Sequence, residues 1–302
     1  MSFSEQIKQY ALSLGFDACG ICKAERIDAE AENAYIQWLS KNGNADMDYL
    51  ARNIEKRFDP RLLVENTKSI ICVALNYFPH ETLPENVPQF AYYAYGEDYH
   101  DVVKAKLNQL FDFIKQQFPE TSGRYFCDSA PVLERYWAAR AGIGFMGKNG
   151  LLIIPRKGSY FFLGELIIDI ELDYDVPILQ DCGNCRRCLD TCPTSAIKKP
   201  YFLDANKCIS YQTIENKDKV TIPLHNNIYG CDICQKTCPF NRFAAPHYTK
   251  EFFPSETFLS LDFEKLKEMN EDTFRHIFQK SAVKRMKFEG LKRNRKFLIL
   301  NS

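Results

Sequence analysis

Eight of the twelve cysteines fall between residues 182 and 238, and seven of these form two blocks that each end with a cysteine-proline pair. The first block has the spacing C-x2-C-x2-C-x3-C-P and comprises Cys182, Cys185, Cys188 and Cys192. The second has the spacing C-x2-C-x3-C-P and comprises Cys231, Cys234 and Cys238. Bacterial ferredoxins use the first spacing to bind 4Fe-4S clusters, with three thiolates on one cluster and the fourth on the other. The blocks therefore predict a region that folds around two 4Fe-4S clusters.

The second block lacks its leading cysteine, because Ile228 stands at that position. Cys208 lies between the blocks and can supply the missing thiolate, which brings the ligand count to eight. The ferredoxin crossover then predicts two ligand sets. They are Cys182, Cys185, Cys188 and Cys238 for one cluster, and Cys192, Cys208, Cys231 and Cys234 for the other.

A disulfide framework and zinc binding are the alternatives for these cysteines. Disulfides need an oxidising compartment, and zinc sites usually pair two C-x2-C hooks or add histidines. The triple run in the first block suits a cuboidal cluster better than either alternative. We therefore prefer the cluster interpretation, which also fits free thiolates in a reducing cytoplasm.

The composition is that of an ordinary globular protein with room for about two domains. The chain has 302 residues, of which 45% are apolar and 14% aromatic. No apolar run reaches the roughly 18 residues of a membrane span, and residues 1–15 lack the apolar region of a signal peptide. We therefore expect a cytoplasmic protein that does not enter a membrane. The zero formal net charge argues against bulk electrostatic coating of nucleic acid.

One segment departs from this charge balance. From Lys280 to Lys296 there are eight basic residues and one acidic residue, Glu289, which gives a local net charge of +7. The segment is either a solvated helix face or a surface that contacts a phosphate backbone, whose binding would weaken with rising salt. The candidate nucleic-acid contacts are Lys284, Arg285, Lys287, Lys292, Arg293 and Arg295.

Hydrophobic periodicity predicts a mixed arrangement of helices and strands in the first half of the chain. Helices are expected over 4–14, 29–42 and 98–118, and strands over 16–24, 69–77 and 124–128. Cys19 and Cys22 lie three residues apart in the first strand and so face opposite sides of it. We interpret them as buried structural thiols and not as a redox pair.

Residues 142–149 contain G-x-G-x-x-G, which binds dinucleotides only when a strand precedes it and a helix follows. Here a helix is expected from Pro131 through Ala141, and an apolar run over 151–154 follows. We therefore interpret the glycines as a tight loop that lets the backbone approach a ligand. Residues 160–170 are expected to return as the hairpin partner of the apolar run.

Two polar positions are weak signals by themselves. Residues 98–103 begin like the Asp-x-His-x-x-Gly motif of proteins that ligate cobalamin through histidine, but the glycine is absent and we reject that interpretation. Lys148, in the glycine loop, either holds an anionic group of a ligand or is solvated. Neither position defines a site.

The predicted architecture is α+β. We expect a mixed α/β domain over 1–175, a ferredoxin-like domain with two 4Fe-4S clusters over 176–245, and a helical basic tail over 246–302. Two clusters alone would make an electron carrier. Because the clusters are joined to a larger domain with a glycine-lined loop, we expect an enzyme that consumes the electrons.

Five segments, in their order and spacing, resemble the epoxyqueuosine reductase family. They are CDSAPVLER over 127–135, AGIGFMGKN over 141–149, GSYFFLGE over 158–165, CISYQTIE over 208–215 and GCDICQ over 230–235. The resemblance extends over about 5–297. Phe145 stands where the family usually has tryptophan, which keeps the position aromatic.

The resemblance implies a cobalamin-dependent oxidoreductase. Such an enzyme reduces the epoxide of epoxyqueuosine to queuosine at the wobble position of tRNAs for Asp, Asn, His and Tyr. Cobalamin would bind in the first domain, and the two 4Fe-4S clusters would pass on electrons from a low-potential donor. We expect a monomer. Related members carry a C-terminal HEAT-like extension, which we expect this chain, ending at Ser302, to lack.

Asp128 matches the proton donor of the family and is the expected catalytic residue. A free aspartic acid has a pKa near 3.9, so burial beside the cofactor would have to raise the pKa of this one. The alternative role is an N-cap of the helix expected to begin near Pro131. The resemblance also implies cofactor contacts, for which turn and cap roles are the alternatives. These contacts are Arg57, Asp128, Asn149, Ser159, Ser210, Tyr211 and Asp232.

Two other functions compete with this one. A corrinoid reductive dehalogenase also joins cobalamin to two clusters, but such enzymes usually carry a twin-arginine export signal, which residues 1–15 lack. A ferredoxin-type carrier without its own substrate would leave the first 175 residues, including Asp128, without a purpose. The sequence therefore favours the reductase.

Overall fold

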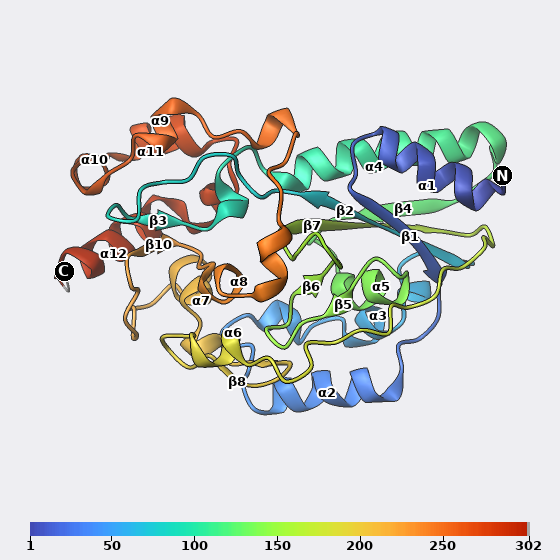
Figure 1. The fold of residues 1–302 in the computed structure, drawn as a ribbon, viewed down its shortest axis with the longest axis horizontal. Helices are drawn as coiled ribbons and strands as arrows, with labels where there is room; N and C mark the ends of the chain where they lie inside the picture. The colour runs from blue at the N-terminus through green and yellow to red at the C-terminus, as the bar shows by residue number, and fades with distance from the viewer. Residues whose placement is uncertain (301–302) are drawn as a thin grey trace.

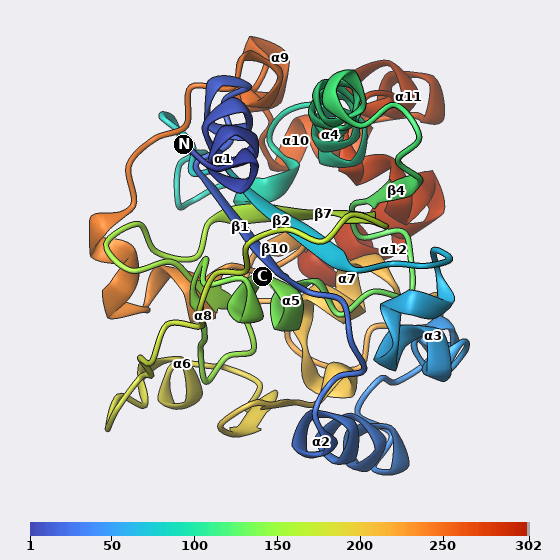
Figure 2. The same ribbon diagram turned by 90° about the vertical axis from the view of Figure 1, so that its right-hand side faces the viewer.

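The computed structural model describes residues 1–300 and shows an α+β fold around one four-stranded antiparallel sheet (Figures 1 and 2). The strands lie in the order β1 (Ala18–Lys23), β2 (Ser69–Asn76), β7 (Phe161–Ile168) and β4 (Gly123–Phe126). The predicted α+β class is confirmed. β2 and β7 lie at the centre and are buried on nearly every residue, which explains why their sequences are continuous apolar runs.

Helices cover both faces of this sheet. α1 (Phe3–Ser13) and α4 (Tyr99–Gln117) pack on one face, where Leu107 is fully buried. α5 (Glu134–Arg140) packs on the other face and places Trp137 against the sheet. Figure 2 shows α1 and α4 on one side of the strands and α5 on the opposite side. The sheet therefore separates two apolar cores.

The two cysteines of the first strand face opposite sides of the sheet, as predicted, and Cys22 is buried whereas Cys19 is half-buried. Cys19 packs against the core under α1 and α4, whereas Cys22 is buried in the core under α5. The two thiols thus lie on opposite faces of the sheet. Burial raises the pKa of Cys19 to about 12, which keeps this thiol neutral and unreactive.

The remaining α-helices and strands are spread over both halves of the chain. In the first half they are α2 (Ala29–Ser40), α3 (Ile54–Phe58), β3 (Gln89–Phe90), β5 (Phe145–Met146) and β6 (Leu152–Ile153). In the second half they are α6 (Arg187–Asp190), β8 (Ile197–Lys199), β9 (Phe202–Leu203), α7 (Ile209–Ile214), β10 (Asn227–Tyr229), α8 (Ile233–Lys236), α9 (Glu256–Leu259), α10 (Phe263–Glu268), α11 (Glu271–Phe278) and α12 (Lys287–Leu300). Within residues 1–300 no helix is both long enough and apolar enough to span a bilayer.

Two local predictions are wrong. The strand β7 does not form a hairpin with β6; it pairs with β2 and β4, while β6 pairs with β5. The reason is that a turn at Arg156 lets the chain leave β6 and enter the central sheet. The helix α5 begins at Glu134 and not near Pro131. Asp128 adopts a left-handed backbone conformation, which turns the chain before the helix, and Leu133 is the N-cap.

A third apolar core joins distant parts of the chain. β3 pairs in parallel with β10, and residues 83–95 pack against α11 and α12 in the second half (Figure 1). Phe90 and Tyr229 are both almost fully buried there. The segment 83–95, which immediately precedes α4, is therefore anchored on the C-terminal helices. The domain boundaries at 175 and 245 stay predictions.

Candidate active site and cluster sites

The first four cysteines of the predicted ligand sets surround one cavity. Its lining includes Cys182, Cys185, Cys188 and Cys238. Cys238 comes from the second block and reaches the first because α6 and α8 pack together, with the hydroxyl groups of Thr191 and Thr237 only 3.3 Å apart. The structure thus brings together the four cysteines that the crossover predicts for one cluster.

The other four cysteines form a second group. Burial raises the pKa of Cys231 to about 12, and the charges of Cys208 and Cys192 raise it further. Burial also raises the pKa of Cys234, with contributions from Cys231 and Cys208. Thiols that act on one another in this way lie close together. Cys188 of the first group also acts on Cys234, so the two groups adjoin each other. The division of the eight thiols into two ligand sets stays a prediction.

The arrangement of these cysteines favours neither a disulfide framework nor zinc binding. All twelve cysteines are free thiols. Throughout the described part of the chain, no three His, Cys, Asp or Glu side chains converge closely enough to hold a single metal ion. A cuboidal cluster separates its thiolates more widely than a zinc ion does, so these donors fit 4Fe-4S clusters.

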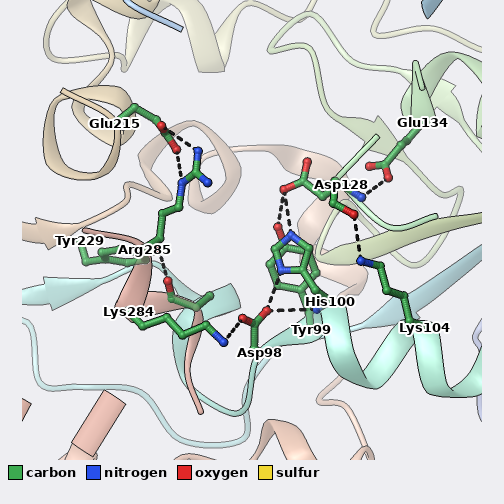
Figure 3. Close-up of polar contacts among 12 residues, drawn as sticks. Asp98, Tyr99, His100, Lys104, Asp128, Glu134, Glu215, Tyr229, Lys284 and Arg285 are labelled. Carbon is green, nitrogen blue, oxygen red and sulfur yellow. Dashed lines mark hydrogen bonds and ion pairs between the residues drawn. The ribbon is translucent and has the colours of Figure 1, made fainter. Parts of the chain in front are cut away.

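Asp128 lies directly after β4 and the buried Cys127, where the chain leaves the central sheet (Figure 3). Its φ of 54° is in the left-handed region, which is uncommon for a residue with a side chain. The side chain is 59% exposed. Since α5 begins six residues later at Glu134, Asp128 is not its N-cap. Its carboxylate instead takes part in contacts with α4.

Two consecutive residues at the start of α4 hold the Asp128 carboxylate (Figure 3). Tyr99 Oη donates a hydrogen bond to Asp128 Oδ2 at 2.6 Å, and His100 Nε2 lies 3.5 Å from the same oxygen. His100 Nδ1 lies 2.6 Å from Oδ1 of Asp98, the N-cap of α4. The ring of Tyr99 stacks between His100 and Phe162, with centroid separations of 4.1 and 4.3 Å.

These contacts decide which group carries the proton. Burial favours a raised pKa for Asp128, but the hydrogen bonds from His100 and Tyr99 prevail and lower it. Burial alone would lower the pKa of His100, but its contacts with Asp128 and Asp98 raise it to about 9. These contacts lower the pKa of Asp128 within the protein itself, and the predicted rise on burial beside the cofactor stays a prediction. At neutral pH Asp128 is a carboxylate and His100 an imidazolium.

Known proteins share both regions of this chain. Residues 57–129 match the family model "Epoxyqueuosine reductase QueG, DUF1730", and residues 181–241 match the model of a 4Fe-4S double cluster binding domain. The epoxyqueuosine reductase of Cellulophaga algicola is 46% identical over 299 residues, which cover 98% of this chain and 97% of that protein. The chain belongs to the epoxyqueuosine reductase family.

Solved epoxyqueuosine reductases have the same fold. A crystal structure with an epoxyqueuosine-modified tRNA-Tyr stem loop has a TM-score of 0.91 and 32% identity, covering 98% of this chain and 80% of that one. A Bacillus subtilis structure with its catalytic loop swung out of the active site has a TM-score of 0.89 and 31% identity, covering 98% and 81%. As a member of this family, the protein is an oxidoreductase whose cofactors are two 4Fe-4S clusters and cobalamin.

In this reductase a second set of polar side chains faces Asp128. Burial raises the pKa of Tyr49 to about 12, and the charges of Glu215, Arg285, Asp128 and Arg57 all act on it. Arg57 is 7% exposed, and its Nε has no hydrogen-bond partner among residues 1–300. A buried guanidinium N–H requires a polar acceptor. Arg57 therefore fits a contact with the polar periphery of cobalamin.

The structure places three of the other predicted cofactor contacts in different surroundings. Asn149 lines the cavity of the first cysteine group. The Tyr211 hydroxyl donates to the carboxylate of Asp46 at 2.5 Å. The carbonyl oxygen of Ser210 accepts a hydrogen bond from Thr213 Oγ1 at 3.2 Å. A cofactor role for the three residues stays a prediction.

Ser159 and Asp232 belong to a buried polar network around Gln235. Ser159 Oγ donates to Gln235 Oε1 at 3.0 Å, and its backbone N–H donates to Asn241 at 2.7 Å. Asp232 accepts the backbone N–H of Tyr92 at 2.7 Å, and burial raises its pKa to about 6. The network fastens the second cysteine block to the sheet domain. A cofactor role for either residue stays a prediction.

Two arginines of the basic segment are used inside the protein. Arg293 donates to backbone carbonyl groups in and after α7. Arg295 donates to the carbonyl oxygens of Leu266 and Met269 at 2.6 and 2.9 Å. These side chains satisfy carbonyl groups at the ends of α7 and α10 that would otherwise lack donors. Their positive charge therefore has a structural use that the charge count did not reveal.

The other basic residues lie at the surface. Lys284 pairs with Asp98 at 2.8 Å, and Arg285 makes a bidentate pair with Glu215 (Figure 3). Lys292 pairs with its neighbour Glu289, and Lys287 begins α12. Since Arg285 also acts on Asp128, the basic segment reaches the active site. Nucleic-acid contact by these four residues stays a prediction. Lys148, by contrast, donates to carbonyl groups of the first cluster loop.

Four residues beside Asp128 were not predicted from the sequence. Tyr99 and His100 follow the capping residue Asp98, so the sequence does place them in the first turn of a helix. Their approach to Asp128 follows from the packing of α4 beside β4, which no local pattern shows. Glu134 and Glu165 lie in two of the recognised family segments, but the sheet alone brings them together.

Proposed function

We propose that this protein reduces the epoxide of epoxyqueuosine in tRNA to the cyclopentene of queuosine, the last step of queuosine synthesis. One observation carries the proposal. The exposed Asp128 carboxylate is held by the proton-bearing groups of Tyr99 and His100, in a chain whose cysteines form two cluster-binding groups. An electron carrier has no use for such a site, and family membership supports a reductase over a dehalogenase.

The cysteine groups match the electron count of the reaction. Conversion of an epoxide to an alkene takes two electrons and two protons and releases the oxygen as water. Each 4Fe-4S cluster carries one electron at a time. The charges of Cys234 and Arg135 both act on Tyr77, and Arg135 also acts on Asp128. We therefore assign the second cluster to the active-site side and the first to the low-potential donor.

Arg57 and Tyr49 are the residues that we assign to hold cobalamin on the side that faces Asp128. The support is the unpaired Nε of Arg57 and the shared electrostatic environment of Tyr49, Arg57 and Asp128. When bound, cobalamin supplies the metal centre that couples single electrons to a two-electron reduction. Both residues come from the same short stretch before β2, so one segment would hold the cofactor.

The proton for the departing oxygen starts on His100 in this proposal. Asp128 is ionised at rest, whereas His100 is protonated and 3.5 Å away. Asp128 passes the proton of His100 to the epoxide oxygen as negative charge develops there. Tyr99 orients the Asp128 carboxylate through its 2.6 Å hydrogen bond. Asp98 stabilises the imidazolium from the opposite side.

The remaining assignments concern partners and location. We assign Lys284, Arg285, Lys287 and Lys292 to contacts with the phosphate backbone of tRNA, because these cations lie at the surface and Arg285 reaches toward Asp128. We also propose a monomer that works in the cytoplasm, where the thiols stay reduced. The electron donor would be a low-potential redox protein that meets the first cysteine group.

Nucleoside analysis of tRNA tests the proposed function. Cells that lack this protein should accumulate epoxyqueuosine in place of queuosine, and a plasmid copy of the gene should restore queuosine. A copy with Asp128→Asn should not restore it. Unchanged queuosine in the deletion strain would refute the proposed substrate.

A further inference from the structure

Glu165 is an acidic side chain in the middle of the protein core. It lies in β7, opposite Cys72 of β2 and Phe126 of β4, and it is fully buried. Within residues 1–300 neither of its carboxyl oxygens receives a hydrogen bond from a donor group. An ionised carboxylate without donors is strongly unfavourable in such a place. Glu165 therefore needs a proton.

Glu134 meets Glu165 from the first turn of α5. The two carboxyl groups lie within hydrogen-bonding distance, and burial raises the pKa of both, that of Glu134 to about 7. Two touching carboxyl groups cannot both ionise, so the pair keeps one proton. Glu165 is the more deeply buried partner and holds this proton, which it donates to an oxygen of Glu134.

Few charged groups face this pair. Asp128 acts on both carboxyl groups and Arg135 on that of Glu134. Thiols of the sheet, among them Cys22, lie near Glu165. Arg135 is a cation that acts on Glu134, and its side chain also donates to the carbonyl oxygen of Gly150. His100 already pairs with Asp128. One arginine cannot neutralise both carboxylates of the Glu134–Glu165 pair, which favours a retained proton.

Glu134 has a second contact, with the backbone of the catalytic candidate. Its Oε1 accepts a short hydrogen bond from the N–H of Asp128 (Figure 3). The left-handed conformation of Asp128 persists only if its surroundings fix it. The neighbouring Ser129 is held by Lys104 Nζ at 2.9 Å. The amide contact to Glu134 is therefore the one that fixes Asp128 from the sheet side.

We propose that Glu134 is a positioning residue for Asp128, and that Glu165 holds Glu134 in place through one shared proton. The inference rests on the proposed function, because the position of Asp128 affects a rate only if Asp128 takes part in the reaction. A catalytic loop can leave the active site in the Bacillus subtilis relative. A contact that retains the loop of this chain would therefore act on the reaction rate.

Two substitutions of similar size test the acceptor role of Glu134. In Glu134→Gln the amide oxygen still accepts the Asp128 N–H, whereas Glu134→Met has no acceptor. Hydrogen exchange of the peptide that contains Asp128, measured on the holoenzyme, reports the contact directly. We expect Glu134→Met to speed this exchange and to lower kcat by about ten- to a hundredfold at unchanged KM for tRNA. Glu134→Gln should stay within about threefold of wild type in both.

The exposed Glu264 of α10 provides the control, since Glu264→Met should change neither quantity. Wild-type exchange and wild-type kcat in Glu134→Met would overturn the proposal. If exchange is faster in Glu134→Met but the wild-type enzyme does not reduce epoxyqueuosine, the positioning contact stands and the proposed function is refuted.

Infrared spectroscopy tests the shared proton, and it does so without turnover. The wild-type holoenzyme at neutral pH should show the carbonyl band of a buried, protonated carboxyl group. The band should be absent from Glu165→Gln, whose amide N–H donates to Glu134 in place of the shared proton and keeps the exchange rate of wild type. Absence of the band in wild type would overturn the proposal. This test does not need Glu134→Met and holds even if that variant does not fold.

Discussion

The cluster region and the Asp128 site of this protein are specified in different ways. Seven of the eight cluster cysteines belong to two short sequence blocks, so local spacing largely fixes the ligand groups. The Asp128 site is assembled from the start of α4, the end of β4, the start of α5 and the centre of β7. The first kind of site can be read from a sequence, whereas the second requires the fold.

The two sites also differ in how they handle charge. In the cluster region, burial keeps thiols such as Cys231 neutral until iron binds. Around Asp128, contacts with His100 and Tyr99 outweigh burial and separate a carboxylate from an imidazolium. The difference shows that desolvation does not by itself decide the pKa of a carboxyl group, because its hydrogen-bond and charge partners can act in the opposite direction.

The largest effect is expected from Cys238→Ser, which tests whether the blocks exchange ligands. Cys238 belongs to the second block but lines the cavity of the first. We expect iron to fall from about eight to about four per chain and epoxide reduction to be lost. Iron analysis and activity measure both. Cys19→Ser, outside both groups, should keep its iron, and an iron content near eight in Cys238→Ser would disprove the crossover.

Asp128→Asn separates the two sites. The amide cannot pass on a proton, so kcat should fall by about a hundred- to ten-thousandfold while both clusters stay bound. Single-turnover kinetics and iron analysis provide the measurements. Asp272→Asn, an exposed change in α11 away from both sites, is the control. Normal turnover in Asp128→Asn would remove this residue from the mechanism.

Tyr99→Phe should have a smaller effect, since it removes one hydrogen bond and leaves His100 in place. Loss of the 2.6 Å contact frees the Asp128 carboxylate to rotate, and we expect kcat to fall by about tenfold. Tyr125→Phe removes a comparable hydroxyl contact, with Asn108 of α4, and should leave kcat unchanged. Equal rates for Tyr99→Phe and wild type would mean that Tyr99 does not orient Asp128.

The smallest effects distinguish structural from RNA-binding cations. Arg295→Ala removes donors from two carbonyl groups and should lower the free energy of unfolding by about 1–2 kcal/mol, measured by urea denaturation. Lys287→Ala should leave the free energy of unfolding unchanged and raise the Kd for a tRNA stem loop by about threefold, with a weaker salt dependence. The opposite pattern would exchange the two assignments.

Much of the fold could be predicted because its long elements carry strong patterns. The apolar runs of β2 and β7 and the periodic face of α4 are each visible in the sequence. The start of α5 could not be predicted, since the left-handed turn at Asp128 leaves no mark in residue type. The partner strand of β7 was missed because pairing with a distant strand has no local signal.

The site was predictable only where one residue type serves one purpose. Cysteine spacing predicted four thiols that the structure brings to one cavity, whereas positive charge did not reveal that Arg293 and Arg295 bind backbone carbonyl groups. His100 was rejected as a ligand on a missing glycine. The role of His100 depends on Asp98, which is close to it in the sequence, and on Asp128, which only the fold brings near.

The pH dependence of single-turnover epoxide reduction, compared between wild type and His100→Gln, tests the central claim most directly. The pKa of His100 is raised from 6.5 to about 9, so its proton and its contribution to stability are complete below 6.5 and are lost as the pH rises through about 9. We predict a wild-type rate that falls above pH 9 and a His100→Gln rate that is about a hundredfold lower and lacks this decline. A His100→Gln enzyme with the rate and the pH profile of wild type would contradict the account.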